Sequence, residues 1–183
     1  DRRKFSGLLD GLGIDQPEWD MRNEFTPVFE DYGVDVVYSG HSHSYERSYY
    51  LRGHTGTSDT FSPDAHAELN ADGDAALGYG NEAYAQLSPT SGGVDDRVVY
   101  TVAGNSGKAD DDSGLGGVTS PEEWLRHAAH VPQPADSECG GSDGCRNGLA
   151  VRGSVVVDAS ATQLTARLVG VDGTVLDQFT IKR

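Results

Sequence analysis

The sequence has no long hydrophobic run and few basic residues. A membrane-spanning helix needs about 20 consecutive apolar residues, and no such stretch occurs. Lys and Arg together number 14 against 29 Asp and Glu, which gives a formal net charge of −15. This balance argues against nonspecific binding to nucleic acid or to an anionic membrane. We therefore expect neither nucleic acid nor membrane as a partner.

Apolar residues are also scarce, at 36% of the chain. A length of 183 residues nevertheless suffices for one domain with a core, and the 24 glycines indicate many turns. Much of the apolar deficit falls in two polar stretches. We interpret residues 1–183 as part of a single domain with insertions at about 48–96 and 108–150.

The apolar residues that are present form short runs and one helical stripe. Before the first run, apolar residues at helical spacing predict a helix that packs this stripe into the core, with Pro27 causing a kink or a late start. Asp172-Gly173, between two apolar runs, is a strong hairpin signal. The stripe consists of Met21, Phe25, Val28, Phe29 and Tyr32. The runs predict strands at 34–39, 97–103, 152–158, 163–170 and 174–181.

Two histidines, His41 and His43, directly follow the predicted strand at 34–39. Open α/β sheets bind ligands at the carboxyl ends of their strands, and neutral imidazole is the commonest metal ligand. A turn at Gly40 would allow the two rings to face different metal ions. The simpler alternative is a pair of polar loop histidines.

The residues around this pair resemble the calcineurin-like metallophosphoesterases, and among them the purple acid phosphatase branch. The resemblance is carried by a Met-Arg helix, a Gly-Val-Asp-Val-Val strand, Gly-His-Ser-His and Tyr-Glu-Arg-Ser, in that order, within residues 21–48. Residues 97–107 and 153–183 are similar to later strands of the same domain. The implied fold is α/β, the C-terminal portion of a β-sandwich flanked by helices in four layers, α/β/β/α.

This resemblance implies a metal-dependent phosphoric ester hydrolase, an acid-phosphatase-like phosphomonoesterase. His41 would bind one of two transition metals (Fe, Zn or Mn) and His43 the other, with a small-molecule phosphate ester as substrate. A phosphodiesterase or nucleotidase on the same site is an alternative. The family's earlier motifs, Asp-x-His, Gly-Asp-x-x-Tyr and Gly-Asn-His-Glu or -Asp, are absent. We therefore expect the chain to depend on a missing N-terminal half of the domain and to be inactive alone, or to be an incomplete binding or structural module.

Several residues near the histidines are further candidates. Tyr45, Glu46 and Arg47 would orient the ligand loop or, for Arg47, approach the phosphate; the alternative is a structural Glu–Arg brace, with Tyr45 in packing. Asn105 would line the site from the turn after 97–103. His54 is a candidate proton donor to the leaving group, or else a surface loop histidine.

The two cysteines, Cys139 and Cys145, bracket five residues of which three are glycine. The family resemblance implies an exported protein, secreted or periplasmic, and a disulfide between them is then favoured. A metal site is the poorer interpretation, because no further cysteine or nearby histidine completes it.

Overall fold

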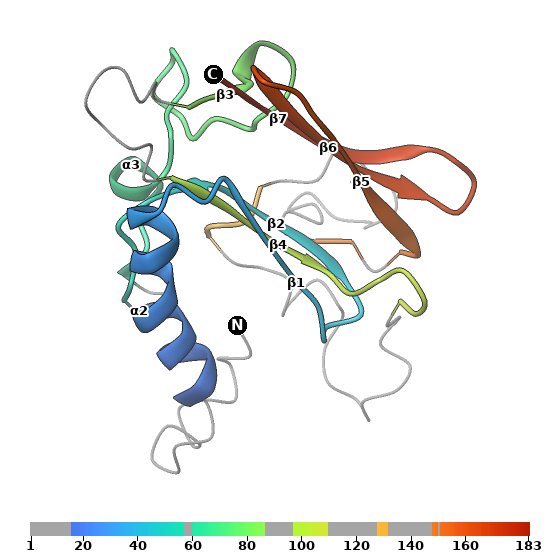
Figure 1. The fold of residues 1–183 in the computed structure, drawn as a ribbon, viewed down its shortest axis with the longest axis horizontal. Helices are drawn as coiled ribbons and strands as arrows, with labels where there is room; N and C mark the ends of the chain where they lie inside the picture. Colours follow the sequence, from blue (N-terminus) through green and yellow to red (C-terminus); the bar gives the residue numbers. More distant parts are fainter. Residues whose placement is uncertain (1–15, 57–59, 87–96, 110–127, 132–147, 150) are drawn as a thin grey trace.

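A computed structural model describes residues 16–56, 60–86, 97–109, 128–131, 148–149 and 151–183. This part of the chain is a mixed α/β structure with two β-sheets and few helices (Figure 1). None of its helices is long and apolar enough to cross a membrane. The elements are α2 (Gln16–Asp31), β1 (Val36–Ser39), β2 (Tyr45–Leu51), α3 (Pro63–His66), η3 (Gly80–Glu82), β3 (Tyr84–Ala85), β4 (Val98–Ala103), β5 (Gly153–Ala159), β6 (Gln163–Gly170) and β7 (Val175–Lys182).

The first sheet has the strand order β1-β4-β2. β1 runs parallel to β4, with Val36 opposite Val99, whereas β2 runs antiparallel to β4. The register of β2 shifts between Arg47 and Tyr50, as at a β-bulge. Because β1 and β4 are parallel, their carboxyl ends lie at the same edge of the sheet.

The second sheet has the order β3-β7-β6-β5, with β3 parallel to β7 and the other pairs antiparallel. The predicted hairpin at Asp172-Gly173 is confirmed, since it connects β6 to β7. Gly173 has a φ of 86°, a left-handed conformation that glycine adopts without steric cost. The Asp172 carboxylate accepts a hydrogen bond of 2.9 Å from the backbone N–H of Thr174, which closes the turn.

The hydrophobic core lies between the two sheets. Tyr50 and Val99 of the first sheet pack in one cluster with Tyr84, Ala166 and Phe179 of the second. The rings of Tyr50 and Tyr84 stack with their centroids 5.1 Å apart. These side chains are buried by the alternation of each strand, which directs every second residue toward the opposite sheet.

Helix α2 packs on the other face of the first sheet, where Phe29 lies 6.5 Å, centroid to centroid, from Tyr100. The described residues thus show three of the four expected layers, and they contain no helix layer outside the second sheet. The predicted late start is wrong, because α2 begins at Gln16 and continues through Pro27.

The prediction that the apolar stripe of α2 packs into the core is wrong for most of its members. Phe29 and its neighbour Thr26 face the sheet, and Thr26 is buried. The stripe is rotated away from this contact, so its other members are largely exposed. They are Met21 (53% exposed), Phe25 (48%), Val28 (46%) and Tyr32 (81%).

The five predicted strands are confirmed with boundaries that agree within two residues. The interval 48–96 contains more regular structure than an insertion suggests, because β2 extends into it and β3, α3 and η3 lie within it. The proposed disulfide between Cys139 and Cys145, and most of the interval 108–150, lie outside the described residues.

Candidate metal site

Residues 40–44 form the connection between β1 and β2, and this loop carries both His41 and His43. Since β4 lies between β1 and β2 in the sheet, the loop crosses the carboxyl end of β4. The two histidines are therefore at the strand ends where the sequence predicts them. The structure brings both imidazoles into a single short loop, with His41 exposed and His43 half-buried.

The crossing is possible because residue 104, directly after β4, is glycine. A Cβ atom at Gly104 would lie only 2.0 Å from the carbonyl oxygen of Ser42. The backbone N–H of Gly104 instead donates a hydrogen bond of 3.2 Å to the carbonyl of Ser44. Gly104 thus seats the histidine loop against the end of β4 by direct backbone contact.

His41 adopts a left-handed backbone conformation, with a φ of 74°. It is the one non-glycine residue with positive φ in the described part of the chain. Such a conformation costs about 1–2 kcal/mol for an ordinary residue, and it persists only where the surrounding structure enforces it. The strain therefore lies at one of the two predicted metal ligands.

The donor chemistry of the loop fits a transition metal, because imidazole suits Zn, Fe and similar ions. His41 and His43 contribute two nitrogen donors. No group of three or more His, Cys, Asp or Glu suited to hold a metal occurs among the described residues. A complete ligand shell would thus require donors from outside this part of the chain.

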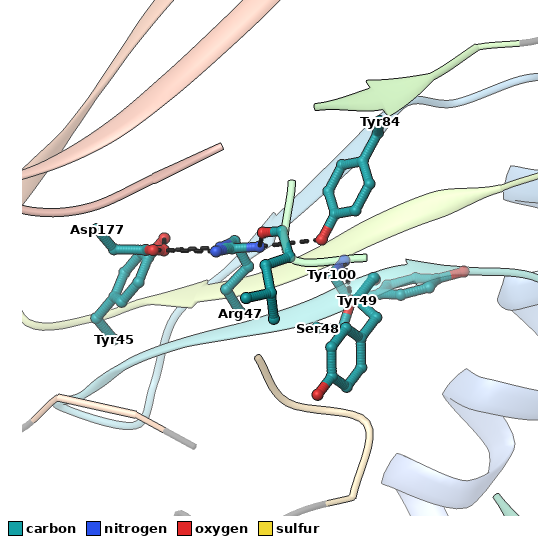
Figure 2. Close-up of polar contacts among 8 residues, drawn as sticks. Tyr45, Arg47, Ser48, Tyr49, Tyr84, Tyr100 and Asp177 are labelled. Atoms are coloured by element: carbon teal, nitrogen blue, oxygen red, sulfur yellow. Dashed lines mark hydrogen bonds and ion pairs between the residues drawn. The ribbon is translucent and has the colours of Figure 1, made fainter. Parts of the chain in front are cut away.

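Next to the loop, a buried polar cluster joins the two sheets (Figure 2). The Arg47 guanidinium donates two hydrogen bonds to the Asp177 carboxylate, of 2.7 Å from Nε and 3.0 Å from an Nη atom. The Tyr45 hydroxyl donates to the same carboxylate at 2.7 Å, and the other Nη atom of Arg47 donates to the Tyr84 hydroxyl at 3.1 Å. Arg47 also lies 5.1 Å from the centre of the Phe179 ring. We call Tyr45, Arg47, Tyr84 and Asp177 the inter-sheet cluster.

The pKa values in the inter-sheet cluster follow from burial and charge. Burial would raise the pKa of Asp177, but the charge and hydrogen bonds of Arg47 outweigh burial and hold this pKa below its usual range. Burial would lower the pKa of Arg47, yet the Asp177 carboxylate raises it. Burial also raises the pKa of Tyr45 and of Tyr84. At neutral pH the cluster therefore holds one charged pair and two protonated phenols.

Glu46 lies on the opposite face of β2 from Arg47, as expected for adjacent strand residues. Its carboxylate accepts a hydrogen bond of 2.7 Å from the Ser44 hydroxyl and lies 3.6 Å from Nε2 of His130. Arg47 thus links the two sheets through Asp177, as in the structural alternative, and Glu46 faces His130 on the other side of β2.

A cavity of about 530 Å³ lies between α2 and the first sheet, and Glu46 and His54 are among its lining residues. The Nε2 atom of His54 is 3.2 Å from the Thr60 hydroxyl, and its ring packs edge-on against His66 at 4.9 Å.

Asn105 follows the contact at Gly104 and is fully buried. Its amide donates to the carbonyl of Val151 at 2.7 Å, while its Oδ1 atom has no hydrogen-bond partner among the described residues.

Asp177 and Gly104 are the important residues that sequence reasoning missed. Asp177 shares the inward register of Phe179 and Ile181 on β7, so a charged residue stands at a core position. This irregularity could have indicated a buried partner such as Arg47, because a buried charge requires pairing. Gly104 gives no comparable signal, since its contact with Ser42 depends on the crossing of the loop.

Comparisons with known proteins give partial matches. No protein-family model matches the chain. Two uncharacterized proteins, from two strains of Mycobacterium tuberculosis, are each 54% identical over 43 residues, which is 24% of this chain and 8% of the mycobacterial protein. The match thus spans a small part of the length of these relatives.

Among solved structures, the purple acid phosphatase isolated from yellow lupin (Lupinus luteus) seeds aligns with this chain. The alignment covers 87% of this chain and 19% of the phosphatase chain. The TM-score of this alignment is 0.42 and the sequence identity 17%.

Proposed function

We propose that the protein of which this chain forms at least a part is a metal-dependent phosphoric ester hydrolase, an acid-phosphatase-like phosphomonoesterase with a dinuclear centre. The observation that carries the proposal is the pair His41 and His43 in one loop at the strand ends, with the backbone of His41 held in a strained conformation. The family motif around the pair, from the Met-Arg helix to Tyr-Glu-Arg-Ser, supports the same reaction class.

In this proposal His41 and His43 each hold one of two transition metals, Fe, Zn or Mn. When bound, such a pair of ions polarises the phosphoryl group and provides a nucleophile at neutral pH. The contact at Gly104 fixes the position of the loop, and Glu46 holds Ser44 at its end through a hydrogen bond. Because the Arg47 guanidinium is neutralised by Asp177, we assign Arg47 to positioning rather than to phosphate binding.

The remaining ligands and the bridging carboxylate are proposed to come from the N-terminal half of the same domain. A small phosphate ester would be the substrate, and the protein would be secreted or periplasmic, with Cys139 and Cys145 in a disulfide. His54 as proton donor is a separate part of the proposal. If it acts, the His54→Gln variant lowers kcat for substrates with poor leaving groups more than for aryl phosphates.

The proposal is tested by metal analysis and by hydrolysis of an aryl phosphate. This chain is compared with a protein extended upstream, and both are examined with His41→Ala, His43→Ala and, as a control, His66→Ala, which changes a histidine on α3. We expect two equivalents of transition metal and turnover in the longer protein, both lost with either loop variant and retained with His66→Ala. Unchanged turnover without His41 or His43 would contradict the proposal.

A second candidate function is a partial, catalytically incomplete binding or structural module. The observation that favours it is that the described residues contain no group of three or more metal-ligating side chains. Absence of both metal and turnover in the longer protein would favour this candidate. A phosphodiesterase or nucleotidase on the same site would instead show metal binding with a different substrate profile.

A further inference from the structure

We infer that Tyr45 is a positioning residue for the metal-binding loop and acts through its hydrogen bond to Asp177. This inference rests on the proposed function, because it concerns how His41 and His43 are held. Tyr45 is the first residue of β2 and stands two positions after His43. Any shift of its backbone is therefore passed directly to the histidine loop.

Tyr45 is fixed from two directions. Its backbone N–H and C=O exchange hydrogen bonds of 2.9 and 2.8 Å with Leu149, and its hydroxyl donates to Asp177 at 2.7 Å. The side chain is 2% exposed, so no water competes for the hydroxyl. Asp177 is itself held by two hydrogen bonds from Arg47. The anchor of the loop thus reaches across the core to β7 of the second sheet.

The other end of the loop has no comparable side-chain anchor among the described contacts. Tyr38 and Ser39, which precede it, are exposed. The Ser39 hydroxyl makes a hydrogen bond of 3.3 Å to the Thr101 carbonyl. The close contact between Gly104 and Ser42 fixes the middle of the loop. The end that follows β1 is held by the backbone pairing of this strand with β4, up to Ser39 opposite Val102, rather than by a buried side chain. The strained conformation of His41 therefore depends on the side-chain anchor at Tyr45.

Tyr84 provides a matched control within the same cluster. Its hydroxyl also makes one buried hydrogen bond to the Arg47–Asp177 pair, from the guanidinium side, and its side chain is fully buried. Tyr84 lies on β3, however, far along the chain from the histidine loop. The variants Tyr45→Phe and Tyr84→Phe each remove one hydroxyl from this cluster, but only Tyr45→Phe removes a contact adjacent to the loop.

The test is a titration of the metal-free full-length protein with Co²⁺, followed by the visible absorption of the bound ion, with thermal melting of each variant alongside. Tyr45→Phe is expected to weaken Co²⁺ affinity by about 10–100-fold, the loss typical of groups that orient a metal ligand. Tyr84→Phe is expected to retain wild-type affinity at a similar melting temperature. Equal losses in the two variants, or no loss in Tyr45→Phe, would overturn the inference.

A second variant separates positioning from folding. Arg47→Met combined with Asp177→Leu replaces the ion pair by apolar residues, so that no buried charge is left unpaired. It removes the acceptor for Tyr45, so Co²⁺ affinity should fall although the protein stays folded. Unaltered affinity in this variant would also overturn the inference. If the wild-type protein binds no Co²⁺, or if His41→Ala leaves binding intact, the proposed function itself fails.

Discussion

Arg47 and Asp177 are 130 positions apart in the sequence and form a fully buried ion pair between β2 and β7. The pair connects β2, which begins directly after the histidine loop, to β7 of the second sheet. A buried pair of this kind is strongly coupled to the surrounding fold, because either partner alone would be an uncompensated charge in a low-dielectric interior. The stability of the two-sheet core and the placement of the candidate metal loop therefore share one interaction.

Removal of one partner is expected to destabilise the protein severely. Asp177→Ala should lower the free energy of unfolding by about 3–5 kcal/mol, because Arg47 is then left buried and unpaired. The double variant, Arg47→Met with Asp177→Leu, should recover part of this loss, because it leaves no buried charge but removes the partners of the Tyr45 and Tyr84 hydroxyls. Urea denaturation followed by circular dichroism measures both. A loss below 1 kcal/mol, on the order of an exposed pair, would contradict the buried geometry.

Stability should fall in acid in a way that depends on Asp177. The pKa of Asp177 is lowered in the folded protein, so the unfolded chain binds its proton more readily than the native state. The stabilisation is complete above the unfolded pKa of about 3.9 and is lost as pH falls through the lower folded value. Urea midpoints measured from pH 6 to pH 2 should show this loss in the wild type. The double variant without the ion pair should show a smaller decrease, and identical profiles would refute the assignment.

Substitution at Gly104 should displace the histidine loop. In Gly104→Ala the new methyl group would lie at 2.0 Å from the Ser42 carbonyl, so the loop must move. We expect a loss of stability of about 1–3 kcal/mol, the usual cost of overpacking, together with weaker Co²⁺ binding. Gly107→Ala is the control, because no atom of the part of the chain that the structure describes lies within 4 Å of the Cβ position there. Equal behaviour of the two variants would show that the close contact has no influence on the loop.

The strain at His41 predicts opposite effects of glycine at the two histidines. His41→Gly relieves the left-handed conformation and should raise the free energy of unfolding by about 0.5–1 kcal/mol, after the greater entropy of glycine in the unfolded chain is deducted. His43 has no positive φ, so His43→Gly should lower stability. Both variants should lose metal binding. Thermal unfolding of the metal-free proteins tests this prediction, and a less stable His41→Gly variant would contradict it.

Strand positions could be predicted because their residues form short apolar runs bounded by turns, as for β6 between Gln163 and Gly170. β2 was missed as a strand because Tyr45–Leu51 contains Glu, Arg and Ser, which look polar in the sequence. In the structure six of its seven residues are buried, and Arg47 is buried because its partner is supplied by β7. The pattern around Tyr45–Leu51 does not show this partner, although the charged Asp177 at a core position of β7 indicates from its own side that a buried partner is needed.

The position of the two candidate ligands was predictable, but the contacts that support their loop were not. The predicted strand at 34–39 placed His41 and His43 at a strand end, where the structure has them, and their role as metal ligands stays a prediction. The seating contact at Gly104 and the hydrogen bond from Tyr45 to Asp177 depend on which strands become neighbours. For α2, periodicity correctly predicted a helix but not the face that meets the sheet, because Phe29 and Thr26, rather than the centre of the stripe, make that contact.

The strand order of the first sheet also bears on how the chain reaches its native state. The contacts between Val36 and Val99 and between Arg47 and Asp177 join residues far apart in the sequence. A long loop must therefore close before either contact can stabilise the structure. Such a topology has a high contact order, and the loop-closure entropy is lost early on the folding path. The β5–β6 and β6–β7 hairpins are local elements that can form first. Refolding is therefore expected to be slow, with the histidine loop acquiring its final shape only when the two sheets have met.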